Sequence, residues 1–176
     1  MNESEFWNLI ESARRSASTV DKASRYLVDH LKEMSVSEIV DFGRHYRNAN
    51  RMAYDERLWV AAITISEHYT SDDVFSDFCD WLIAQGKTIF DRALANPDSL
   101  ADLELVGKGD GIGHEGFTMA SVASEAYEEK TGQKNFSHAL GLLPPPELKN
   151  ANTWDGNPET LKQIVPRLHA KYATKL

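Results

Sequence analysis

The stretch Leu58-Trp59-Val60-Ala61-Ala62-Ile63-Thr64-Ile65 decides the fold class, because it is nearly all apolar. Such a run is typical of a buried strand or of a buried helix, and periodicity alone cannot separate the two. Its alanine content, the helical charge pattern on either side and the lack of a partner strand favour a central helix over about residues 55–69. We therefore predict an all-α fold, packed around this segment and around residues 75–82.

Three capping boxes indicate where neighbouring helices begin. They are Ser18-Thr19-Val20-Asp21, Ser35-Val36-Ser37-Glu38 and Thr70-Ser71-Asp72-Asp73. In a capping box the first side chain accepts a hydrogen bond from the backbone of the fourth residue, whose own side chain reaches back. Gly86 fits the position that follows the last turn of the third of these helices. The pattern predicts a single compact domain of seven to nine helices.

Glycine and proline divide the chain into a regular and an irregular part. Residues 1–96 hold no proline and two glycines, whereas residues 97–176 hold six prolines and eight glycines. Both residue types interrupt helices. The predicted layout is a helical core over 1–106, a glycine-rich loop over 107–116, a helix over 117–132, an irregular stretch over 133–157 and a C-terminal helix over 158–174, which Pro166 kinks or splits. We expect the loop to be dispensable for folding, and Trp154 to pin the irregular stretch onto the body of the domain.

The charge balance limits the partners of the protein. There are 19 basic and 27 acidic residues, which gives a net charge of −8. This charge argues against nucleic acid as the main ligand and against anionic membrane surfaces. No apolar run is long enough to span a membrane, and the acidic start does not resemble a signal peptide. We therefore expect a soluble, cytoplasmic protein that binds a protein partner rather than a membrane.

Motifs for a cofactor, a metal or a nucleophile are missing from the sequence. Residues 107–116 are rich in glycine, but a helix rather than a strand is predicted before them, and the Gly-Lys-Ser/Thr pattern of a phosphate loop is absent. His114-Glu115 begins like a zinc-protease helix, yet Thr118 stands where the second histidine belongs. Cys79 lies near Asp77 and Asp80, and we interpret it as a packing residue. We predict no cofactor and no metal site.

Two acidic groups are candidates for a site. Asp72 and Asp73 could form a carboxylate pair, but they fall in the first turn of a helix, where carboxylates complement the helix dipole. We favour capping, with the Asp73 carboxylate returning to the Thr70 amide. Tyr127 and Glu128 lie on an acidic helix face, for which solvation is the default interpretation.

Arginine is concentrated on the helix that follows Ser35. Arg44, Arg47 and Arg51 share one face, because they are three and seven residues apart. That face lies away from the predicted apolar seam, which includes Tyr46, so we expect the three side chains to be exposed. The stripe is either a solvated face paired with acidic neighbours from another helix, or a site for an anion or an acidic partner.

Several segments resemble a mostly bacterial family classed as a domain of unknown function. They are Phe6-Trp7-Asn8-Leu9-Ile10, Ser71-Asp72-Asp73-Val74-Phe75 with Phe78 and 81–86, Ala126-Tyr127-Glu128-Glu129-Lys130-Thr131-Gly132, and Trp154-Asp155 with Pro166-Arg167-Leu168 and Ala170-Lys171-Tyr172. The resemblance spans nearly the whole chain, with residues 107–116 outside the family pattern. It implies a single, mainly helical module and carries over no reaction and no catalytic residue.

Two function hypotheses follow from these observations. The first is a non-enzymatic binding or regulatory module that acts through protein–protein contacts, because a helical scaffold is predicted without a convergent nucleophile, base or metal set. The second is a small enzyme whose site forms between helices, with Asp72, Asp73, Tyr127 and Glu128 among the acid/base candidates. Carboxylates that converge in one concave pocket would favour the enzyme, and dispersed carboxylates would favour the binding module.

Overall fold

A computed structural model describes residues 1–17, 20–66, 71–103 and 119–172 of the chain. These residues form helices and no strands, so the all-α class is confirmed. The predicted loop at 107–116 and the box at 18–21 fall wholly or partly outside the described residues. The elements are α1 (Glu3–Ser16), α2 (Val20–Leu31), α3 (Val36–Ala53), α4 (Glu56–Ile65), α5 (Asp72–Ala84), α6 (Lys87–Ala95), η1 (Pro97–Asp102), α7 (Met119–Thr131), α8 (Phe136–Leu140), η2 (Pro158–Thr160), α9 (Leu161–Ile164) and α10 (Pro166–Tyr172).

The ambiguous apolar stretch is a helix, as predicted. It forms α4, in which every position from Leu58 to Thr64 except Trp59 is buried. Asp55 begins the helix as its N-cap, and its carboxylate accepts a hydrogen bond from the Arg57 amide at 2.9 Å. The Thr64 hydroxyl donates to the Val60 carbonyl at 2.8 Å, so this buried polar group is satisfied inside the helix.

The helix starts confirm one predicted cap and correct another. Ser35 caps α3 in a full capping box with Glu38, as expected. At α5, however, the N-cap is Ser71, which accepts a hydrogen bond from the Val74 amide at 3.3 Å. The third residue of this helix is therefore Val74 rather than Asp73. Thr70, the predicted cap and the predicted partner of Asp73, lies outside the described residues.

Gly86 connects α5 to α6 with a backbone conformation that requires glycine. Its φ is +85°, and a Cβ there would meet the carboxylate of Glu11. Its amide donates to the Ile83 carbonyl at 3.0 Å, which closes the last turn of α5. The predicted end of this helix is therefore confirmed.

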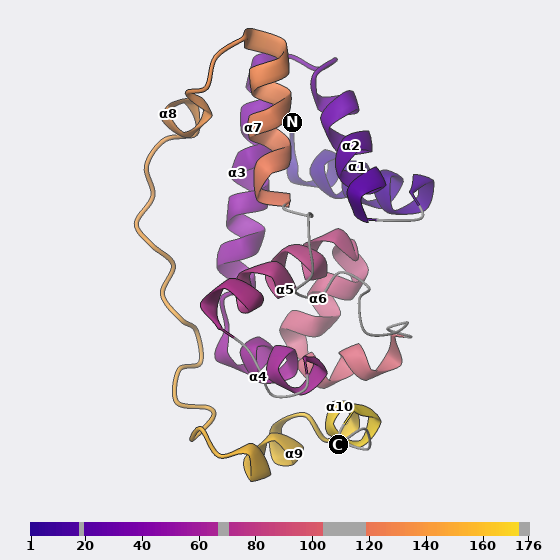
Figure 1. The fold of residues 1–176 in the computed structure, drawn as a ribbon, viewed down its shortest axis with the longest axis vertical. Coiled ribbons are helices and arrows are strands. Elements are labelled where there is room, and N and C mark those ends of the chain that lie inside the picture. The colour runs from indigo at the N-terminus through magenta and orange to yellow at the C-terminus, as the bar shows by residue number, and fades with distance from the viewer. Residues whose placement is uncertain (18–19, 67–70, 104–118, 173–176) are drawn as a thin grey trace.

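Two groups of helices share one core (Figure 1). In the upper group, α3 and α7 lie side by side with α1 and α2 next to them; in the lower group, α4, α5 and α6 pack beneath. Aromatic side chains fill the space between the elements. The fully buried ones are Phe6, Phe42, Phe75, Phe78 and Phe90.

A long segment without regular structure, residues 141–157, runs down one side of the molecule from α8 to the C-terminal helices (Figure 1). We call it the strap. Its Lys149 pairs with the α4 start through an isolated bridge, donating to the Tyr54 carbonyl at 3.0 Å and accepting from the Glu56 amide at 2.9 Å. Trp154 is half-buried against the core, as expected for a pinning residue.

The predicted C-terminal helix is split at Pro166, into α9 and α10. Because Pro166 cannot continue the hydrogen-bond ladder of α9, a second helix starts there. The buried carboxylate of Asp98 accepts hydrogen bonds from the Arg167 and Leu168 amides, each at 2.9 Å. An aspartate from η1 thus satisfies the free amides at the start of α10.

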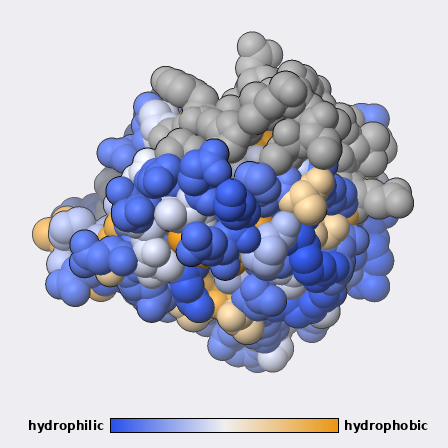
Figure 2. Space-filling model, turned by 90° about the horizontal axis from the view of Figure 1, so that it is seen from below, coloured by the Kyte–Doolittle hydropathy of each residue, from blue (hydrophilic) through white to orange (hydrophobic). Residues whose placement is uncertain are grey.

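The lower face of the molecule is mostly polar where the structure describes it. Figure 2 shows that hydrophobic side chains on the lower face appear only in small separate groups. No helix in the described part of the chain has the length and apolar character needed to cross a membrane.

Candidate binding groove between α3, α7 and α8

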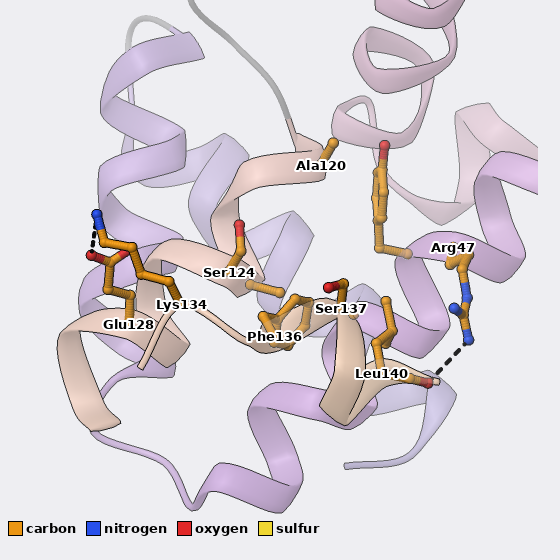
Figure 3. A pocket seen from close by; sticks show the side chains of 11 residues that line it. Arg47, Ala120, Ser124, Glu128, Lys134, Phe136, Ser137 and Leu140 are labelled. Atoms are coloured by element: carbon orange, nitrogen blue, oxygen red, sulfur yellow. Dashed lines mark hydrogen bonds and ion pairs between the residues drawn. The ribbon is translucent and has the colours of Figure 1, made fainter. Parts of the chain in front are cut away.

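A groove of about 400 Å³ lies where α8 meets α3 and α7 (Figure 3). Its lining combines two parts of the sequence that are far apart: one side of α3, and the consecutive segments α7 and 134–140. Much of the lining is apolar. The apolar lining residues are Gly43, Ala120, Ala123, Phe136 and Leu140.

Gly43 allows α8 to approach α3 closely. A Cβ at this position would lie 2.6 Å from Cζ of Phe136 and 3.2 Å from Cδ1 of Leu140. Glycine inside a helix costs about 1 kcal/mol relative to alanine. The ring of Phe136 also contacts Tyr127 of α7, with 5.4 Å between the ring centroids. The missing side chain therefore makes a seat on α3 for the aromatic ring of α8.

Arg47 closes one end of the groove. Its guanidinium donates to the Gly141 carbonyl at 2.7 Å and to the Leu140 carbonyl at 3.3 Å (Figure 3). These carbonyls stand at the C-terminal end of α8, where helix carbonyls lack partners and carry partial negative charge. The Arg47 Nε is buried and has no hydrogen-bond partner among the described residues. Burial, followed by the nearby charges of Arg44 and Arg51, lowers the pKa of Arg47.

An ion pair closes the opposite end of the groove. Lys134 Nζ lies 3.2 Å from a Glu128 carboxylate oxygen (Figure 3). Both side chains are exposed, Lys134 to 83%, so the pair contributes little to stability. Their charges are free to rearrange around a ligand.

A buried hydrogen-bonded pair supports the floor of the groove. The Tyr46 hydroxyl donates to Asp80 Oδ1 at 2.6 Å, and the Ala120 amide lies 3.5 Å from Asp80 Oδ2. Asp80 is only 3% exposed. Burial raises the pKa of Asp80 to about 6, against the lowering effect of the Tyr46 hydrogen bond. The pKa of Tyr46 is raised by burial and by the Asp80 charge.

Sequence reasoning missed both members of this pair as a site. It placed Tyr46 on the apolar seam of α3 and considered Asp80 only as a neighbour of Cys79. The available signal was an aspartate between Cys79 and Trp81, inside a run whose helical spacing is otherwise apolar. Cys79 itself is buried, and burial raises the pKa of its thiol, as expected for a packing residue.

The stripe of Arg44, Arg47 and Arg51 is less exposed than predicted, and two of its members have partners that the sequence did not indicate. Arg44 is exposed and pairs with Asp41 of its own helix at 3.1 Å. Arg47 and Arg51 are half-buried, and Arg51 donates to the Pro144 carbonyl at 2.6 Å. The partners of these two are main-chain carbonyls of α8 and the strap rather than acidic side chains of another helix. Carbonyl groups occur at every residue, so the sequence carries no signal for such contacts.

The structure does not bring all the acid/base candidates together. Glu128 and Arg47 line the groove from opposite ends, and Tyr127 is buried behind the Phe136 ring. Asp72 and Asp73 are exposed in the first turn of α5 and do not line the groove. Within the described ranges, no cluster of three or more His, Cys, Asp or Glu side chains is placed to hold a metal ion. His114 lies outside those ranges.

Comparison with known proteins places the chain in a family. Residues 1–129 match the family model described as "Protein of unknown function (DUF4240)", and the chain belongs to that family. The match includes residues 107–116, which the sequence-based resemblance left out, and it ends before the segments of the C-terminal part. Searches of curated proteins and of solved structures gave no match. The α3 and α7 walls of the groove therefore lie in the matched range, whereas Lys134 and α8 lie beyond it.

Proposed function

We propose that this member of the DUF4240 family is a protein-binding module, and that its partner contacts the groove between α3, α7 and α8. The supporting observation is that the α3 and α7 walls of this groove already hold a short amphipathic segment, α8, through apolar side chains and main-chain hydrogen bonds. Phe136 and Leu140 supply the apolar contacts, and Arg47 supplies the hydrogen bonds. Both kinds of contact are typical of peptide recognition by a groove.

The distribution of carboxylates supports binding over catalysis. Glu128 is the one acidic side chain among the described lining residues, and it is paired with Lys134. Asp72 and Asp73 lie on an exposed helix start instead. A catalytic carboxylate pair would require two carboxylates that reach one substrate.

The enzyme alternative has one observation in its favour. Asp80, with a pKa of about 6, can exchange a proton near neutral pH, and Tyr46 lies within hydrogen-bond distance. However, Asp80 is 3% exposed, and its oxygens face Tyr46 and the start of α7. A substrate would reach it only after α7 moved away, so we rank catalysis second.

The groove can be tested by filling it with a long side chain. Ser124 of α7 lines the groove, and its hydroxyl is bonded to its own helix, 2.7 Å from the Ser121 carbonyl. Ser124→Arg places a bulky cation in the groove. Ser12→Arg is a matched control, because Ser12 is also a half-buried helical serine bonded to its own helix, at Asn8, 2.8 Å away.

Affinity purification from native lysate with mass spectrometry then compares the two variants with the wild type. We expect a protein that is enriched by the wild type and by Ser12→Arg, but not by Ser124→Arg. Circular dichroism must show equal helicity for all three. Equal enrichment by both variants would exclude the groove as the contact site.

A further inference from the structure

We infer that the surface of α3 and α7 that α8 covers recognises the C-terminal end of an amphipathic helix with an aromatic residue at position i and a leucine at i+4. In this inference α8 is an internal occupant of that surface, and such a partner helix replaces it. This inference rests on the proposed function and gives the partner its chemistry. The partner takes over the seat at Gly43 and the hydrogen bonds of Arg47.

The first reason is that α8 depends on the groove for its shape. It has five residues and none of them is fully buried. A helix of this length is not stable by itself in water, because nucleation is unfavourable and few hydrogen bonds compensate for it. The groove therefore selects a helical turn from a segment that would not form one alone.

The second reason is the spacing of the apolar contacts. Phe136 and Leu140 are four residues apart, so they lie on the same helix face. Both meet the surface of α3 at Gly43, where a Cβ would come within 3.2 Å of each side chain. This seat fits an aromatic ring followed one turn later by a branched aliphatic side chain.

The third reason is charge complementarity at the helix end. The C-terminus of a helix carries partial negative charge on its free carbonyls. Arg47 meets two of these groups, at Leu140 and Gly141. A helix presented in the opposite direction would bring its amide groups to this cation instead. The groove therefore favours one helix direction.

The fourth reason is that few contacts hold the chain directly before and after α8. Residues 132–135 before it and 141–145 after it are exposed. The first strap contacts after α8 are hydrogen bonds from Arg47 and Arg51 to main-chain carbonyls, which water can replace. Leu142 is fully exposed and Leu143 is 47% exposed, so neither anchors the strap.

The test uses the full chain with its own segment as the probe. Phe136→Ala with Leu140→Ala empties the apolar seat, and a fluorescent synthetic peptide with the sequence of residues 132–143 is added. In the wild type, the tethered α8 competes with the peptide at an effective concentration of roughly millimolar. We expect the peptide to bind the emptied variant at least tenfold more tightly than the wild type, measured by fluorescence anisotropy.

Two further changes in the emptied variant test the seat and the cation separately. Gly43→Ala fills the seat and should abolish peptide binding. Arg47→Met keeps the aliphatic stem but removes the donors, and should weaken binding about tenfold. Arg44→Met is its matched control, because Arg44 pairs with Asp41 rather than with α8, and it should leave binding within twofold.

The inference fails if a folded, emptied variant does not bind the peptide, or binds it no better than the wild type does. If the double variant loses cooperative unfolding, Leu140→Ala alone replaces it under the same criteria. A wild-type dimer that dissociates on Phe136→Ala would instead assign the groove to α8 of a second copy. The proposed function fails separately, when Ser124→Arg leaves partner enrichment unchanged while the peptide still binds.

Discussion

The ring of Phe136 occupies the space in which a side chain at Gly43 would begin, with Cζ 2.6 Å from an ideal Cβ. The two residues are 93 positions apart, and they join the part of the chain matched by the family to the part beyond it. Because of this contact, glycine is favoured at a helix position where alanine has the higher intrinsic helix propensity.

Gly43→Ala is therefore expected to release α8 without unfolding the domain. The change removes a helix-interior glycine, a gain of about 1 kcal/mol in the free energy of unfolding. The new Cβ pushes the Phe136 ring out of its seat. Hydrogen exchange should become faster at the amides of α8, while the melting temperature stays equal or rises.

The background Phe136→Ala provides the control for this prediction. Without the ring, the one close contact left for the new Cβ is Leu140 Cδ1 at 3.2 Å, the end of a flexible side chain. Gly43→Ala should then stabilise the protein by up to about 1 kcal/mol. If the amides of α8 exchange equally fast in the wild type and in Gly43→Ala, the packing of the Phe136 ring does not depend on glycine at position 43.

The titration of Asp80 should lower the free energy of unfolding as the pH rises. Its pKa in the folded protein is about 6, above the usual value of 3.8 for an aspartate, so the folded state binds the proton more tightly than the unfolded state. The stability from this group is fully present below about pH 4 and is lost as the pH rises through about 6. A shift of this size corresponds to about 3 kcal/mol at most. Carboxylates with lowered pKa, such as Asp41 and Glu11, act in the opposite direction.

The measurement is therefore a difference between the wild type and Asp80→Asn in urea unfolding from about pH 4 to about pH 8. The advantage of the wild type over the variant should shrink steadily with rising pH, because the amide of the variant cannot titrate. Asp77→Asn is the control: the Asp77 charge helps to raise the pKa of Asp80, so its removal should reduce the pH dependence. A pH-independent difference would show that Asp80 is not the titrating group.

Local features of the fold were predictable from the sequence, because their causes lie within a few residues. The Ser35 capping box, the end of α5 at Gly86 and the split at Pro166 all depend on one residue and its nearest neighbours. The helical character of residues 58–65 was also predictable, since no second strand was available to pair with it.

The groove was not predictable, because its causes are contacts between distant residues. Gly43 reads as a weak point of a helix until Phe136 is placed beside it. The role of Arg47 depends on carbonyl groups, which every residue has. Asp80 did carry a signal, since a charged residue in an apolar helical run must find partners when buried. Those partners, Tyr46 and Ala120, could be named only from the structure.

The cap of α5 gives a prediction about stability alone. Ser71→Ala removes the hydrogen bond to the Val74 amide and should cost about 1 kcal/mol. For a chain of this size, that is a shift of roughly 2–4 °C in melting temperature. Asp73→Asn removes only a favourable charge in the first turn and should cost less, at most about 0.5 kcal/mol. Differential scanning calorimetry separates the two, and a larger loss from Asp73→Asn would restore Asp73 as the main cap.

Arg47 and Arg44 of α3 should differ in their effect on the strap. Arg47→Gln removes the charged donor to the carbonyls of Leu140 and Gly141, so the start of the strap is expected to come loose. Arg44→Gln removes an exposed pair with Asp41, which contributes little to stability. Limited proteolysis should therefore cut Arg47→Gln faster near residues 141–143, with wild-type rates for Arg44→Gln. Both variants lose one positive charge from the same helix, so a general charge effect would accelerate cleavage in both. Equal acceleration would show that the hydrogen bonds of Arg47 do not hold the start of the strap.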